Sequence, residues 1–188
     1  MIEIGKFNHL KVIKQYAKEI FLDGGESGDI VLAATDVVKE INLGDELNVF
    51  VYVGEKDSLQ ATTRLPYAQV DDVAWLKCVS VSDVGAFLDW GLAKDLLLPY
   101  SEQSTKIVEG RSCLVKVFLD ESNRIAASML LDDFIEEEAF YLKEGDKVDL
   151  VIADETDLGR KAVVNNEYWG VLYKNEIFQK LRKGQKTT

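Results

Sequence analysis

The sequence has little of what catalysis and metal binding usually need. Its 188 residues include one histidine and two cysteines. A structural zinc site needs about four Cys or His ligands and a Ser-His-Asp triad needs a placed histidine, so we expect neither around His9. We therefore expect no catalytic residues, no metal, no cofactor and no enzymatic activity. Cys78 and Cys113 align with apolar residues in the repeat described below, which predicts two buried thiols rather than a disulfide framework.

Long hydrophobic runs are absent as well. No apolar run approaches the ~20 residues that cross a bilayer, which gives no membrane partner. Residues 1–6 lack the basic and apolar regions of a signal peptide. Together with the free cysteines, these absences predict a cytoplasmic protein.

Positive charge is scarce over most of the chain. The net charge is −11. Phosphate binding depends on Lys and Arg, so this balance argues weakly against a nucleic-acid partner. Residues 159–188 differ, with seven basic residues against two acidic ones, a net charge of +5 that leaves −16 for residues 1–158. The basic end either contacts a polyanion or is a polar chain end, and composition alone leaves both open.

A threefold internal repeat organises the chain. A shift of 66 positions places Phe21 on Phe87, and a shift of 74 places Gly110 on Gly184, with apolar positions matching around both. The units are roughly 65 to 75 residues long, a size that can fold as a small domain. The third unit stops just after the glycine that precedes two further strands in the others. We interpret it as a truncated unit, or one that needs a partner to close it.

The middle unit predicts five short strands from apolar residues that alternate or cluster between turns. These are expected near residues 76–81, 86–88, 96–98, 113–117 and 125–128. Five strands with a longer third connection fit a Greek-key oligonucleotide-binding (OB) barrel, and an SH3-like barrel is the competing choice. We expect an all-β chain of tandem five-stranded OB barrels at residues 1–65, 70–132 and 140–188, the third incomplete.

The connection after the middle unit is acidic. Residues 132–138 contain five carboxylates at a spacing that fits one or two helical turns. Charge runs of this kind usually form a solvated face, and we interpret this one in the same way.

Three segments of the middle unit resemble the RNA-binding repeat of ribosomal protein S1. They are residues 84–88, 95–102 and 120–128. The whole chain is similar to the conserved virulence factor B family, most closely at 85–91 and 165–178. This resemblance implies tandem S1-type domains, a cytoplasmic bacterial regulator of gene expression that binds single-stranded RNA, and a C-terminal winged-helix portion missing here.

The chain departs from that family pattern at several positions. Val84 stands where the family has an aromatic residue, and Pro99 stands where it has a histidine. In the first unit Gly54 and Ser58 replace the acidic and basic pair of the middle unit. In the third unit Lys161 replaces the strand phenylalanine. We therefore expect each unit to bind RNA weakly by itself.

Phe87 and its counterpart Phe21 are the first candidates for RNA contact. Ala86 and Leu88 lie on the opposite face of the same strand, so one face must point outward. An outward ring would stack on a base, whereas an inward ring would fill a core.

Three further candidates lie at turns. Trp90 matches Gly24 and Val164 in the other units, which indicates a partly exposed turn rather than a core position. Its ring either stacks on a base or packs against a neighbouring unit, and we favour packing. Asp120 and Arg124 either form a surface ion pair that holds a hairpin, or Arg124 reaches a phosphate with Asp120 orienting it.

Aromatic and basic residues occur together near the end of the chain. They are Arg160, Lys161, Tyr168, Trp169, Tyr173 and Lys174. Rings for bases and cations for phosphates are the combination that single-stranded nucleic acid uses, although the same rings can fill the core of the third unit.

Two functions follow from the sequence. The first is a non-enzymatic RNA-binding protein in which the acidic first unit is a scaffold. The second, favoured by the net charge, is a protein-interaction scaffold whose barrels no longer bind nucleic acid and which has a protein partner.

Overall fold

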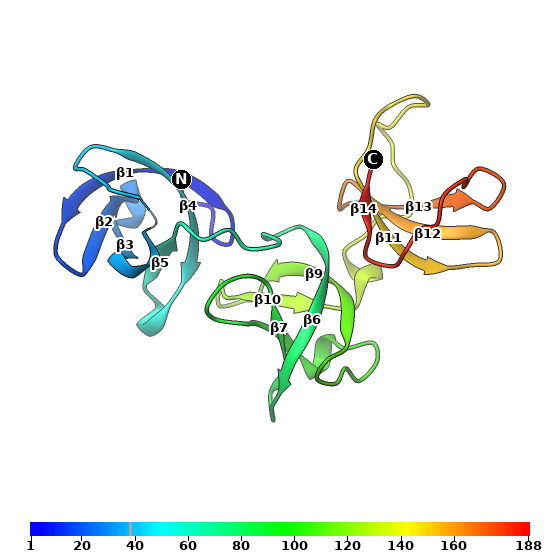
Figure 1. Ribbon diagram of the computed structural model, residues 1–188, viewed down its shortest axis with the longest axis horizontal. Coiled ribbons are helices and arrows are strands. Elements are labelled where there is room, and N and C mark those ends of the chain that lie inside the picture. The colour runs from blue at the N-terminus through cyan, green and yellow to red at the C-terminus, as the bar shows by residue number, and fades with distance from the viewer. Residues whose placement is uncertain (38) are drawn as a thin grey trace. The chain divides into compact units, whose positions relative to one another are not determined.

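The computed structural model describes residues 1–37 and 39–188 and consists mainly of β-strands (Figure 1). Two closed five-stranded barrels are followed by a four-stranded sheet. The expected all-β chain of tandem OB barrels with an incomplete third unit is confirmed. Among the described residues, no helix is long and apolar enough to cross a membrane.

By its contacts the chain divides into two compact units. Unit 1 contains Met1–Val70, Trp90–Asp95 and Phe118–Ala126. Unit 2 contains Asp71–Asp89, Leu96–Val117 and Ala127–Thr188. Unit 1 thus contains the first repeat and two segments of the middle repeat, so these units do not correspond to single repeats. The domain limits expected from the sequence stay a prediction.

Barrel 1 is formed by the first repeat. Its strands are β1 (Phe7–Gln15), β2 (Glu19–Asp23), β3 (Asp29–Ala33), β4 (Glu46–Val53) and β5 (Leu59–Thr62), in the order β1-β2-β3-β5-β4. The barrel closes where β3 pairs in parallel with β5, at Val31 with Gln60 and Leu32 with Ala61. The core contains fully buried side chains such as Leu22, Ile30 and Val49.

Barrel 2 repeats this arrangement. Its strands are β6 (Val73–Val81), β7 (Gly85–Asp89), β8 (Leu96–Pro99), β9 (Ser112–Leu119) and β10 (Ile125–Ser128), in the order β10-β8-β7-β6-β9. This Greek-key order is that of an OB barrel, so the SH3-like alternative is wrong. Cys78 and Cys113 are buried as expected, and burial raises the pKa of the Cys113 thiol to about 11.

The third repeat forms the four-stranded sheet. Its strands are β11 (Leu150–Glu155), β12 (Gly159–Val164), β13 (Tyr168–Tyr173) and β14 (Lys186–Thr187), in the order β13-β12-β11-β14. The first strand of each repeat is bulged at the same place, after Val12, Cys78 and Ile152. A bulge bends the strand and increases its twist, and its recurrence supports the repeat at the level of register.

Short 3-10 turns connect some of the strands. They are η1 (Gly25–Ser27), η2 (Ala34–Asp36), η3 (Glu55–Asp57), η4 (Tyr100–Glu102) and η5 (Leu131–Asp133). The last of these starts the acidic connection, where the sequence predicts one or two helical turns.

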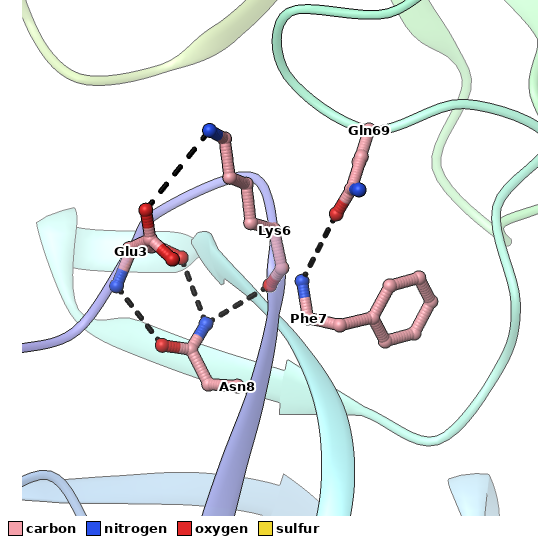
Figure 2. A network of polar contacts seen from close by, with 5 residues as sticks. All are labelled: Glu3, Lys6, Phe7, Asn8 and Gln69. Carbon is pink, nitrogen blue, oxygen red and sulfur yellow. Dashed lines mark hydrogen bonds and ion pairs between the residues drawn. The ribbon is translucent and has the colours of Figure 1, made fainter. Parts of the chain in front are cut away.

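Polar contacts fasten the N-terminal residues of unit 1 (Figure 2). The Asn8 side chain accepts from the Glu3 backbone N–H at 2.9 Å and donates to the carbonyls of Glu3 and Lys6. The Gln69 side chain accepts from the Phe7 N–H at 3.3 Å. These bonds hold the start of β1 and the chain that follows barrel 1 in one unit.

Within unit 2, Asn166 joins the β12–β13 turn to barrel 2. Its carbonyl accepts from the Lys116 ammonium at 2.8 Å, and its side chain accepts from the Val73 N–H at 2.9 Å. The same side chain donates to Asp72 at 3.2 Å. Lys116 is 7% exposed, and this carbonyl offsets part of the cost of burying its charge.

We predict that Gly184→Ala destabilises the protein more than Gly110→Ala, its equivalent in barrel 2. Both glycines have positive φ, +81° and +84°, so both alanines adopt a left-handed conformation. An added Cβ at Gly184 would lie 2.2 Å from Trp75, whereas at Gly110 it would meet nothing within 4 Å. The expected excess loss is about 1–3 kcal/mol of unfolding free energy, measured by urea denaturation. Equal losses would contradict the Trp75 contact.

Candidate nucleic-acid interface

Each closed barrel presents one phenylalanine outward from its second strand. In β2, Ile20 and Leu22 are buried in the core, and Phe21 between them is half-buried on the outer face. In β7 the same alternation leaves Phe87 half-buried on the outer face. Of the two positions open to Phe87 from its sequence, inward or outward, the structure shows the outward one.

The outer face of barrel 1 is aromatic around Phe21. Val31 is its cross-strand partner on β3, and the Tyr16 ring meets it edge-on at 5.7 Å. The Lys14 ammonium lies 5.8 Å from the ring centroid and is paired with Asp29 at 2.6 Å. The result is a half-buried ring with a cation beside it, on a strand whose other apolar residues, Ile20 and Leu22, fill the core.

A hollow of about 470 Å³ lies beside this ring, over the parallel seam of β3 and β5. Val31, Gln60 and Tyr52 line it as cross-strand neighbours, and Lys18 lies at its rim. Burial, with a smaller effect of the Asp36 charge, raises the pKa of Tyr52 above its ordinary value. Its phenol is a hydrogen-bond donor at neutral pH, as an unshifted tyrosine also is. Gln60 offers both a donor and an acceptor, the pair of groups that a base edge requires.

The outer face of barrel 2 is apolar around Phe87. Its cross-strand partner is the half-buried Leu97. Val84 is 54% exposed and Tyr100 is 42% exposed, and the Tyr100 hydroxyl donates to the Ser82 carbonyl at 2.6 Å. Tyr100 follows the departure at Pro99, so an aromatic ring remains at the end of β8 where the family histidine is absent.

Trp90 differs from its expected environment. The sequence predicts a partly exposed turn, but the side chain is 5% exposed. Its indole N–H donates to the Lys94 carbonyl at 2.7 Å, and its ring meets Phe50 of barrel 1 edge-on at 5.6 Å inside unit 1. Trp90 therefore packs within unit 1, the alternative favoured from the sequence, and a contact of its ring with RNA stays a prediction.

The side chains of Asp120 and Arg124 do not form an ion pair with each other in the described structure. The Asp120 carboxylate accepts from the backbone N–H groups of Ser122 and Arg124, at 2.8 and 2.9 Å, and so holds the β9–β10 turn. The Arg124 guanidinium is half-exposed and lies 2.8 Å from Asp57, an exposed carboxylate in the same unit 1. The expected surface ion pair between Asp120 and Arg124 is therefore wrong, although Asp120 does hold the hairpin.

Some residues of the basic and aromatic cluster of the third repeat are buried or ion-paired, and others lie at the surface. Tyr168 is 5% exposed and packs edge-on against Tyr141, and its expected contact with RNA stays a prediction. Arg160 pairs with Glu155 at 3.4 Å. Tyr173, 48% exposed, and Lys174 are at the surface.

Lys161 and Trp169 lie together on the outer face of the third sheet. The Lys161 ammonium is 3.8 Å from the centroid of the Trp169 ring. The Trp169 indole N–H donates to Asp132 at 3.0 Å, and Lys161 is 3.9 Å from the same carboxylate oxygen. Apolar parts of this face pack in a cluster with Val73 and Leu114 of barrel 2.

The structure adds residues that the sequence reasoning missed. Tyr52, Gln60 and Val31 surround the hollow of barrel 1, while Leu97 and Tyr100 extend the surface of barrel 2. The alternation of inward and outward residues along the strands could have identified the strand residues among them, because each cross-strand neighbour of an outward phenylalanine also faces outward.

Comparison with known proteins agrees with this fold. Residues 4–64 match the model of the S1 domain family. The protein YitL of Bacillus subtilis (strain 168) is 32% identical over 124 residues, 62% of this chain and 41% of YitL. Conserved virulence factor B of Staphylococcus epidermidis is 26% identical over 140 residues, 71% of this chain and 47% of that protein. The chain therefore spans less than half the length of these relatives.

A solved structure has the same fold over nearly all of the chain. It is a multidomain protein with nucleic acid binding domains from Streptococcus pneumoniae TIGR4, with a TM-score of 0.58 and 18% identity. The match covers 97% of this chain and 67% of that one. The resemblance expected from the sequence is confirmed by these findings.

We predict that Trp90→Phe destabilises the protein without a specific effect on nucleic-acid binding. The substitution removes the indole bond to the Lys94 carbonyl and shrinks a buried ring, so the expected loss is about 1–3 kcal/mol of unfolding free energy. Thermal denaturation measures this loss, and a titration with a labelled oligonucleotide is made well below the melting temperature. A binding defect in fully folded protein would show that Trp90 does contact the ligand.

Proposed function

We propose that this chain, a relative of conserved virulence factor B whose residues 4–64 form an S1 domain, binds single-stranded RNA on the outer faces of its two closed barrels. The domain family and the fold point to nucleic-acid binding, and the choice of RNA and of its single-stranded form is our proposal. The function is binding rather than catalysis.

The observation that carries this proposal is the recurrence of one outward phenylalanine at the same register of both barrels. Phe21 and Phe87 are half-buried on strands whose other apolar residues fill the core. A solvent-facing ring contributes little to a core, and stacking on such a ring is worth about 1–3 kcal/mol per base. Val31 and Leu97 extend each ring into an apolar strip across two strands.

Cations at the surface of the chain would contact phosphates. Lys14 and Lys18 lie near Phe21 and the hollow of barrel 1, and Arg124 projects from the β9–β10 turn. Lys14 and Arg124 are paired with exposed carboxylates, and exposed pairs are worth at most about 1 kcal/mol, so a phosphate can replace either carboxylate. The net charge of −11 predicts weak binding to each barrel.

Two weak sites on one chain bind a strand more tightly than either does alone. Once one barrel is bound, the second contact is intramolecular and is governed by an effective concentration. In this proposal barrel 1 takes part through Phe21 and its hollow, rather than serving only as a scaffold. A cytoplasmic bacterial regulator that binds RNA to control gene expression would fit this design.

A protein-interaction scaffold is the second candidate. The charge of −16 over residues 1–158 favours it, and so do Phe140 and Tyr141, which are 84% and 68% exposed beside the acidic run. An acidic segment with exposed rings suits a basic protein surface better than a polyanion.

We predict that Phe21→Ala and Phe87→Ala each weaken binding to a labelled oligouridine of about 12 nucleotides by at least about five-fold, because one stacked base is lost. Fluorescence anisotropy at several NaCl concentrations measures the affinity, which should fall as salt rises. Phe140→Ala, at an exposed ring outside the strands, is the matched control and should leave affinity unchanged.

Two results would overturn the proposal. One is equal affinity of the Phe87→Ala and Phe140→Ala proteins, which would remove the stacking surface. The other is no binding by the wild-type chain at low salt, which would leave the scaffold as the better account.

A further inference from the structure

In the third sheet, a lysine occupies the position that is equivalent to the outward phenylalanine of each barrel. Lys161 on β12 is equivalent to Phe21 and Phe87, and Val171 is its cross-strand partner, as Val31 and Leu97 are theirs. An ammonium group therefore stands where each barrel has an outward ring.

This ammonium group lies beside the ring of Trp169 and near the same acceptor as its indole N–H. Trp169 supplies a ring face 3.8 Å from the Lys161 nitrogen and an indole N–H that points to the same acceptor. A cation and a neutral N–H converge on one oxygen, an arrangement that suits a carboxylate or a phosphate equally well. In the structure that oxygen belongs to Asp132 of the chain itself.

Asp132 is placed there by its neighbours. Its turn, η5, is anchored by Leu131, Phe134 and Ile135, which pack in the same apolar cluster as Val163 and Trp169. Glu136 then adds a backbone bridge to β13, with the Trp169 N–H donating to its carbonyl at 2.8 Å. The acidic connection is thus held against the sheet by apolar and backbone contacts that do not involve the Asp132 carboxylate.

The carboxylate itself is easily displaced. Its side chain is 81% exposed and its distance to Lys161 is 3.9 Å, so water screens the pair. Exposed pairs of this kind contribute at most about 1 kcal/mol, which corresponds to a factor of about five in affinity.

We propose that Lys161 and Trp169 form a phosphate site for RNA and that Asp132 occupies it as a built-in competitor. This inference rests on the proposed function and deepens it, because it assigns the third sheet a phosphate contact where the barrels have a stacking ring. The competition makes RNA binding by this sheet weaker than its basic charge alone would give.

The test compares Asp132→Asn with Asp133→Asn in the full 188-residue chain. Both remove one negative charge, but Asp133 makes neither of the contacts described for Asp132, and the asparagine oxygen at 132 still accepts from Trp169. Asp132→Asn should tighten binding of the labelled oligouridine about two- to five-fold more than Asp133→Asn. Near-ultraviolet circular dichroism checks that the surroundings of Trp169 are unchanged.

Lys161→Gln supplies the second arm. In this background the gain in affinity from Asp132→Asn should disappear, because the cation that both the carboxylate and the phosphate use is gone. The slope of log affinity against log salt concentration should also decrease by the amount expected for about one phosphate contact. A gain that persists without Lys161, or equal affinities of the two asparagine variants, overturns the inference.

The outcomes separate the two proposals. If the wild-type chain binds and loses affinity with Phe87→Ala while the asparagine variants are equal, only the competitor is overturned. If only Asp132→Asn binds detectably, the competitor is supported, and RNA binding by the unaltered chain, the proposed function, is overturned. If neither wild type nor Asp132→Asn binds, both proposals are overturned.

Discussion

Closure of a five-stranded barrel is the constraint on which the other features depend. It requires the second strand to give alternate side chains to the core, as Ile20 and Leu22 do, and this forces the residue between them outward. In the two closed barrels this outward residue is Phe21 or Phe87, and the open third sheet has Lys161 at the equivalent position of its second strand. The alternation of inward and outward side chains along the second strand therefore keeps the core the same in each repeat and lets the surface residue differ.

Features that depend on contacts within one repeat could be predicted from the apolar pattern of the sequence. The strands, the buried thiols of Cys78 and Cys113 and the incomplete third repeat follow from alternation and from the repeat, because each is fixed within a unit. For Trp90 the sequence favoured packing but predicted partial exposure, since its burial depends on Phe50, which is forty residues earlier in the chain. The partner of Arg124 was missed for the same reason, because Asp57 lies in another repeat.

For the acidic connection at residues 132–138, composition did not predict the contacts that one of its carboxylates makes. Its carboxylates were interpreted as a solvated face, and Asp132 is indeed 81% exposed. Exposure and contact are not alternatives, however, because the indole N–H of Trp169 and the ammonium of Lys161 both lie near one oxygen of this exposed carboxylate. Apolar neighbours of Asp132 at Phe134 and Ile135, not the charge run, determine where that carboxylate lies.

Direct mapping of RNA contacts tests the central claim most sharply. The chain is photo-crosslinked to an oligonucleotide containing 4-thiouridine, and the modified peptides are identified by mass spectrometry. The account predicts crosslinks on β2 and β7, at or beside Phe21 and Phe87. Crosslinks confined to the exposed segment around Phe140, or to none of the strands that carry these rings, would contradict it.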